Sequence, residues 1–229
     1  MNRSITLTFD NGPAAGVTPQ VLDVLARHEI RATFFVLGQN LESKAGKALA
    51  RRAADEGHWI GNHTYSHEVP LGETTDPDAP RKEIGRTQEL IGALTHPDRL
   101  FRPFGGGGII APHLLSKGAF EFLKVRRYTC VLWNSIPHDW DDPDGWPETA
   151  LAQARERDWT LTVLHDYETG AMRHLESYIE KARAEGFAFR QAFPADCVPM
   201  VRGVPRRAMD AFISTPTTTS SPQETQHAN

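Results

Sequence analysis

The chain has 229 residues, of which 39% are hydrophobic and 24% charged, a composition typical of one sizeable soluble globular domain. The formal net charge of −4 argues against nucleic acid as the main partner, because phosphate binding favours a basic surface. No apolar stretch approaches the roughly 20 residues that a membrane helix needs, and the first apolar run is too short for a signal peptide, so we expect a cytoplasmic protein without a membrane partner.

Short β-rich runs alternate with helical patterns along the chain. Residues 5–9 predict a strand, and Thr18 with Pro19 predicts the N-cap and first position of the helix that follows. A helix over about residues 46–56 is expected to end at Gly57. The other expected strands are residues 32–36, 58–61, 100–101, 128–133, 160–164 and 187–190, and the other expected helices are about 81–94, 113–123, 147–157 and 172–185.

Seven strands with helices between them predict parallel β/α units joined by right-handed crossovers. We treat residues 1–213 as one catalytic domain. Residues 214–229 are rich in Thr, Ser, Pro and Gln and are predicted to be a disordered tail.

Polar residues that are far apart in the sequence each follow a different expected strand. They are Asp10, His63, Arg102, Asp139 and His165. In a β/α barrel these positions converge at the carboxyl ends of the strands, where active sites are built. We therefore expect these side chains to share one pocket.

Two histidines four residues apart suggest a metal site. His63 and His67 can face the same way if their segment is helical or tightly turned. Two neutral imidazoles, one oxygen ligand and an open position form the usual catalytic zinc arrangement. Asn11 can supply an amide oxygen, although a neutral ligand would hold the metal more weakly. Taken alone, Asn11 fits a turn residue before Gly12 equally well.

Two further residues are candidates for proton transfer. Asp10, a carboxylate beside a bound cation, is the candidate general base. His165 is the candidate general acid for a leaving amine, provided that a neighbouring carboxylate keeps its imidazole protonated. Either Asp139 or Asp166 could be that carboxylate.

Five short motifs carry a resemblance to a known family. In chain order they are Thr8-Phe-Asp-Asn-Gly-Pro13, His63-Thr-Tyr-Ser-His67, Arg102-Pro-Phe-Gly105, Asp139-Trp140 and Leu164-His-Asp166. With them the chain resembles the polysaccharide deacetylases of carbohydrate esterase family 4, the NodB-homology domain. The resemblance implies a distorted (β/α)7 barrel, a divalent metal, usually zinc, and hydrolysis of acetyl groups on sugars.

The resemblance also implies a role for each matching residue. Asp10 would be the base, oriented by Arg102, and His165 would be the acid. His63 and His67 would be metal ligands. Asp139 is expected to assist catalysis, and three apolar residues of the later motifs are expected to contact the substrate: Phe104, Trp140 and Leu164.

The chain departs from the family pattern at two positions that matter for the chemistry. The family's second aspartate, a metal ligand, is Asn11 here, and Ile136 stands where motif four usually carries an aspartate. Motif three is also altered, with four consecutive glycines after Phe104. Because the base, both histidines and the acid remain, we expect a modified site with weakened zinc binding.

Three functions are compatible with these residues. The first is a metal-dependent deacetylase acting on an N-acetylated sugar or oligosaccharide. The second is a relative of the same fold that hydrolyses a non-sugar amide or cyclic ureide without a metal. The third, motivated by Asn11 and Ile136, is a non-catalytic carbohydrate-binding relative.

Overall fold

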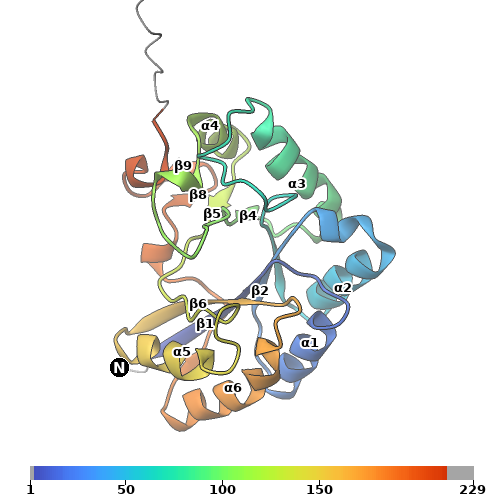
Figure 1. Ribbon diagram of the computed structural model, residues 1–229, viewed down its shortest axis with the longest axis vertical. Helices are drawn as coiled ribbons and strands as arrows, with labels where there is room; N and C mark the ends of the chain where they lie inside the picture. Colours follow the sequence, from blue (N-terminus) through green and yellow to red (C-terminus); the bar gives the residue numbers. More distant parts are fainter. Residues whose placement is uncertain (1–2, 216–229) are drawn as a thin grey trace, which may run out of the picture.

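A curled, mixed β-sheet forms the centre of the molecule, and helices cover its outer side (Figure 1). The computed structural model describes residues 3–215. The strands are β1 (Ser4–Asp10), β2 (Thr33–Val36), β3 (Trp59–Asn62), β4 (Leu100–Phe101), β5 (Thr129–Cys130), β6 (Trp159–His165), β7 (Ala188–Phe189), β8 (Met200–Val201) and β9 (Val204–Pro205). All seven strands expected from the sequence are present, and β8 and β9 are additional.

The sheet order, β6-β1-β2-β3-β4-β5-β8-β9, places the first five strands side by side in chain order. Strands β1 to β6 pair in parallel, β7 pairs with the first residues of β1, and β8–β9 is an antiparallel hairpin on β5. The segment after β5 pairs with β6 at Ser135, whose carbonyl accepts a hydrogen bond from Val163 N at 3.1 Å. The sheet thus curls into a half-barrel, which confirms the predicted distorted (β/α)7 type.

Six α-helices follow the predicted pattern. They are α1 (Thr18–Arg27), α2 (Lys44–Asp55), α3 (Arg86–Ile91), α4 (Lys117–Val125), α5 (Trp146–Arg155) and α6 (Leu175–Ala184), with a π-helical turn, Pro80–Gly85, leading into α3. Gly57 follows α2 with a φ of 88°, as expected for the residue after a helix end. The predicted N-cap at Thr18 is wrong: Thr18 is the first helical residue, and its hydroxyl donates to Asp166 Oδ2 at 2.6 Å.

The alternation of side chains along the strands divides the core into two layers. Leu7 and Phe9 of β1 and Leu164 of β6 pack outward against the helices. Phe35 and Val163, which alternate with Phe34 and Leu164 along their strands, face the opposite side of the sheet and belong to a second apolar cluster. Polar side chains at the carboxyl ends of the strands therefore point into the half-barrel.

Among residues 3–215, no helix is long and apolar enough to cross a membrane. The predicted disordered tail, residues 214–229, lies outside the described residues except for its first two positions.

Candidate active site

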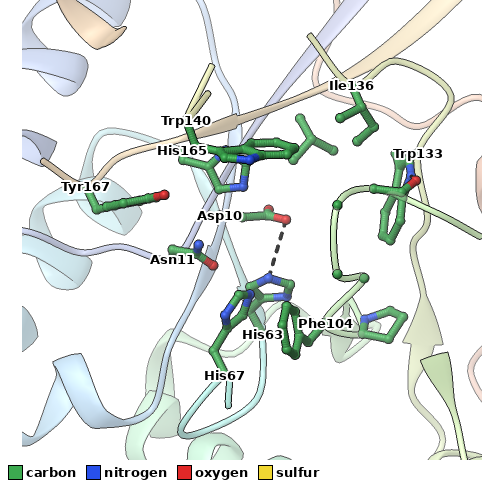
Figure 2. Close-up of a pocket in the computed structure, with 16 residues that line it drawn as sticks. Asp10, Asn11, His63, His67, Phe104, Trp133, Ile136, Trp140, His165 and Tyr167 are labelled. Atoms are coloured by element: carbon green, nitrogen blue, oxygen red, sulfur yellow. Dashed lines mark hydrogen bonds and ion pairs between the residues drawn. The ribbon is translucent and has the colours of Figure 1, made fainter. Parts of the chain in front are cut away.

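One pocket at the carboxyl ends of the parallel strands collects most of the predicted site residues (Figure 2). Seven of them line it: Asp10, Asn11, His63, His67, Phe104, Trp140 and His165. Arg102 and Asp139 lie directly behind the lining and are fully buried. The convergence expected from strand-end placement is therefore observed.

Asp10 is held by a buried arginine. Arg102 Nη1 donates to Asp10 Oδ1 at 2.8 Å and to Thr8 Oγ1 at 2.7 Å. Its Nε and Nη2 donate to the carbonyls of Val131 and Leu132 at 3.3 and 3.2 Å. These contacts fix the guanidinium, which in turn fixes one oxygen of Asp10 and leaves the other, Oδ2, facing the pocket.

Replacing Arg102 by methionine is expected to destabilise the fold by roughly 3–5 kcal/mol, because the Asp10 carboxylate would stay buried without its partner. Urea unfolding measures the change. The matched control is Arg81→Met, whose ion pair with Asp78 is exposed and should contribute little. Equal losses in the two variants would contradict this account of Arg102.

The ring of His63 is fixed by one hydrogen bond and keeps its other nitrogen unprotonated. Its Nδ1 lies 2.9 Å from the Arg102 carbonyl oxygen, and a carbonyl only accepts, so Nδ1 carries the proton. The unprotonated Nε2 faces Asp10 Oδ2 at 3.6 Å, a separation too wide for a hydrogen bond (Figure 2). Burial lowers the pKa of His63 to about 3, so the imidazole is neutral, as a ligand must be.

His67 reaches the same place through a tight turn after β3. Its ring centroid lies 5.0 Å from that of His63, and burial lowers its pKa to about 3 as well. Glu83, which the sequence did not single out, holds this turn: Oε2 accepts from the amides of Tyr65 and Ser66 at 2.9 Å each, and Oε1 accepts from the Ser66 hydroxyl at 3.0 Å. The turn thus has a fixed shape that brings both imidazoles to one side.

Asn11 places an unsatisfied amide oxygen beside the histidines. Its backbone has a φ of 71°, in the left-handed region that asparagine tolerates. The side-chain Oδ1 is buried and has no hydrogen-bond partner, which is rare for a buried polar atom (Figure 2). An oxygen in this state is suited to bind a ligand that the protein itself does not supply.

The donor set fits a divalent cation. Within residues 3–215, no group of three or more His, Cys, Asp or Glu side chains is placed to hold a metal ion. With the amide oxygen of Asn11, His63 and His67 would make up three protein ligands, with Asp10 adjacent. Two imidazole nitrogens and one neutral amide oxygen attract a cation less strongly than a ligand set in which a carboxylate replaces the amide.

Asp139 is the carboxylate paired with His165, which the sequence left open between Asp139 and Asp166. Asp139 Oδ1 lies 2.8 Å from His165 Nδ1, and Oδ2 accepts from the His165 amide at 2.9 Å. Burial lowers the pKa of His165, but the hydrogen bond and charge of Asp139, together with the charges of Asp10 and Asp166, outweigh burial, so the pKa is raised. Asp166 instead accepts from the Thr18 hydroxyl.

Aromatic side chains form the walls of the pocket. Phe104 lies against His67 with a centroid separation of 3.8 Å, and Trp140 meets His165 edge-on at 5.0 Å. Leu164 does not line the pocket: the prediction that it contacts substrate is wrong, because adjacent residues of a strand face opposite sides and Leu164 packs among the helices. Val163, one residue earlier, lines the pocket in its place.

Several lining residues were not among the predicted site residues. Tyr167 stands two positions after His165, and Ile136 follows β5. Trp133 Nε1 donates to the Gly108 carbonyl at 2.8 Å, and a Cβ on Gly105 would lie 2.4 Å from the Trp133 ring. The glycine-rich loop therefore packs closely on Trp133 and forms one side of the pocket. Continuing the alternation of β6 for two residues past its end at His165 would have indicated Tyr167.

Comparison with known proteins matches this chain to one family. The family model for polysaccharide deacetylase matches residues 1–110. A chitooligosaccharide deacetylase of Rhizobium leguminosarum bv. trifolii is 36% identical over 167 residues, which cover 72% of this chain and 72% of the relative. The chain belongs to the polysaccharide deacetylase family.

Other members of the family are similar over a comparable part of the chain. A peptidoglycan-N-acetylglucosamine deacetylase of Listeria monocytogenes is 29% identical over 190 residues, or 82% of this chain and 38% of the relative, so the chain spans well under half the length of that relative. A family 4 acetyl xylan esterase from Clostridium thermocellum, solved in complex with a cobalt ion, has a TM-score of 0.64 and 30% identity, covering 82% of this chain and 88% of the esterase.

Proposed function

We propose that this polysaccharide deacetylase family member is a metal-dependent hydrolase that removes the acetyl group from an N-acetylated sugar in an oligosaccharide or polysaccharide. One observation carries the proposal: a single pocket holds a fixed carboxylate, two neutral imidazoles with an unsatisfied amide oxygen, and an imidazole paired with a buried carboxylate. Relatives named for chitooligosaccharide and peptidoglycan N-acetylglucosamine support the substrate class.

On the base side of the pocket, Asn11, His63 and His67 would hold the cation, with zinc expected. The cation would act as a Lewis acid toward the acetyl carbonyl. Asp10, with one oxygen fixed by Arg102, uses Oδ2 to accept the proton of the attacking water. Because Arg102 holds Asp10 in place, the carboxylate need not reorient during this step.

His165 works on the other side of the scissile bond. Its Nδ1 donates to Asp139, which leaves Nε2 as the atom that donates a proton to the sugar nitrogen when the carbon–nitrogen bond breaks. The raised pKa of His165 keeps the imidazolium populated, and Asp139 stabilises its charge. The products are acetate and a sugar amine.

Asp139→Asn is expected to move the basic limb of the kcat–pH profile to lower pH. His165 acts as an acid only when protonated, and Asp139 contributes most of what raises its pKa, ahead of the charges of Asp10 and Asp166. Without the hydrogen bond and charge of Asp139, burial lowers the pKa of His165, and the protonated fraction is lost at lower pH. The control is Asp141→Asn, since the Asp141 side chain is 69% exposed. An unchanged basic limb in Asp139→Asn would remove His165 from the acid role.

Acetate release from N-acetylglucosamine oligomers tests the proposed function. Release that stops on addition of a chelator and returns with zinc is the expected result. Chelator-insensitive hydrolysis of a cyclic ureide or imide, with no acetate from the oligomers, would select the metal-independent alternative. Saturable oligomer binding with no acetate at any zinc concentration would identify a carbohydrate-binding protein without catalysis.

A further inference from the structure

Four arginines surround a second pocket at the opposite end of the sheet from the active site. Arg99 immediately precedes β4 and Arg127 lies just before β5, whereas Arg102 and the other active-site residues follow the strands. The cavity has a volume of about 470 Å³, and its complete lining is Pro97, Arg99, Val125, Arg126, Arg127 and Arg202. The β8–β9 hairpin, which carries Arg202, lies beside α4 in Figure 1.

Three of these arginines occupy backbone positions that disfavour their residue type. Arg99, Arg127 and Arg202 have φ values of 48°, 60° and 48°, in the left-handed region where a side chain is strained. Glycine, asparagine or aspartate is the usual choice there. The backbone therefore does not account for arginine at any of the three positions.

The position of Arg127 can be compared with the same position after other helices of the chain. Arg127 is the second residue after α4, and its amide donates to the Lys124 carbonyl. Gly57 after α2 and Gly186 after α6 have the same place and the same backbone hydrogen bond, whereas Glu29 after α1 is, like Arg127, a residue other than glycine there. Arg202 occupies the first position of the two-residue turn between β8 and β9, where asparagine before glycine is preferred.

Positive charge in this pocket is largely uncompensated. Arg202 Nε donates to Asp98 Oδ1 at 2.5 Å, and Arg99 Nη1 donates to the Arg126 carbonyl at 3.1 Å. Among residues 3–215, no side-chain hydrogen bond or salt bridge engages the guanidinium of Arg126 or Arg127; the Arg126 guanidinium lies over the Phe122 ring, 5.1 Å from its centroid. The C-terminal end of α4 attracts cations, but this attraction does not account for Arg202 in a separate hairpin.

We propose that this arginine pocket, formed by Arg99, Arg126, Arg127 and Arg202, binds a phosphate-bearing anion. Guanidinium groups bind phosphate oxygens through paired hydrogen bonds, and several of them around one cavity match an oxyanion with more than one charge. A single carboxylate would be satisfied by one arginine. The ligand is a small phosphorylated molecule or a chain of linked phosphates, which share this chemistry.

The test uses the full chain and two probes, inorganic pyrophosphate and long-chain polyphosphate, titrated by calorimetry at low ionic strength. The test variant is Arg127→Gly with Arg202→Asn, because both replacements suit the left-handed backbone. One control, Glu29→Gly, makes the same backbone change after α1, where Glu29 has a φ of 52°. The other, Arg81→Gln, removes an arginine whose side chain is 69% exposed, outside the pocket.

Saturable pyrophosphate binding, weakened at least tenfold in the double variant and kept in both controls, is the expected result. If polyphosphate bound with the same variant dependence and pyrophosphate did not bind, the ligand would be a chain of linked phosphates rather than a small phosphorylated molecule. The double variant should melt no lower than the wild type without probe, because it relieves strain. No saturable binding of either probe, or equal binding by wild type and double variant, would overturn the proposal.

Discussion

His165→Ala is expected to lower kcat by about 10²–10⁴-fold and to change KM much less. His165 lines the pocket while its Nδ1 is held by Asp139, so alanine removes the proton donor from the leaving nitrogen. Steady-state kinetics with N-acetylglucosamine oligomers and zinc give both parameters. The free energy of unfolding, measured in parallel, shows whether the fold is kept.

A nearby histidine provides the matched control for this variant. His138 packs beside Trp140 at a centroid separation of 4.8 Å, but its side chain is 49% exposed and does not line the pocket. His138→Ala should keep kcat within a fewfold of the wild type. If His165→Ala lost activity only in proportion to lost folded protein, His165 would be structural and the acid would have to be sought elsewhere.

The strand ends were predictable from the sequence because apolar β-rich runs stop at polar residues. Asp10, His63 and His165 each follow such a run, and parallel strands bring their carboxyl ends to one edge of a sheet. The same strand logic also rules out Leu164: it lies between Val163 and His165, which both line the pocket, so alternation turns its side chain to the helices. The family motif predicted Leu164 as a substrate contact, but its side chain lies among the helices and does not line the pocket.

Two features of the site depend on contacts between residues far apart in the sequence, and local sequence patterns could not predict them. Thr18 has the residue type of an N-cap, but its hydroxyl is engaged by Asp166, which is 148 positions away. The choice between Asp139 and Asp166 as the partner of His165 likewise depends on how two distant segments pack. Strands β8 and β9 form an antiparallel hairpin with no helix between them, so the alternation of strand and helix patterns that indicated the parallel strands does not extend to them.

Asn11→Asp is expected to tighten zinc binding by tenfold or more, which corresponds to about 1.4 kcal/mol. The Asn11 Oδ1 is buried without a partner beside His63 and His67, so a carboxylate there would add direct charge attraction to the same donor set. Calorimetric titration of metal-stripped protein measures the affinity. His63→Ala should abolish binding, and Gln39→Glu, which adds a charge at an exposed position near the histidine turn, should leave the affinity almost unchanged.

Tighter binding in Asn11→Asp need not bring faster catalysis. A carboxylate ligand offsets more of the cation's charge than an amide does, and the pull of the cation on the acetyl carbonyl weakens accordingly. We therefore expect activity to rise in Asn11→Asp at zinc concentrations that leave the wild type partly loaded, and kcat at saturating zinc to stay level or fall. An unchanged zinc affinity would show that Asn11 does not contact the metal.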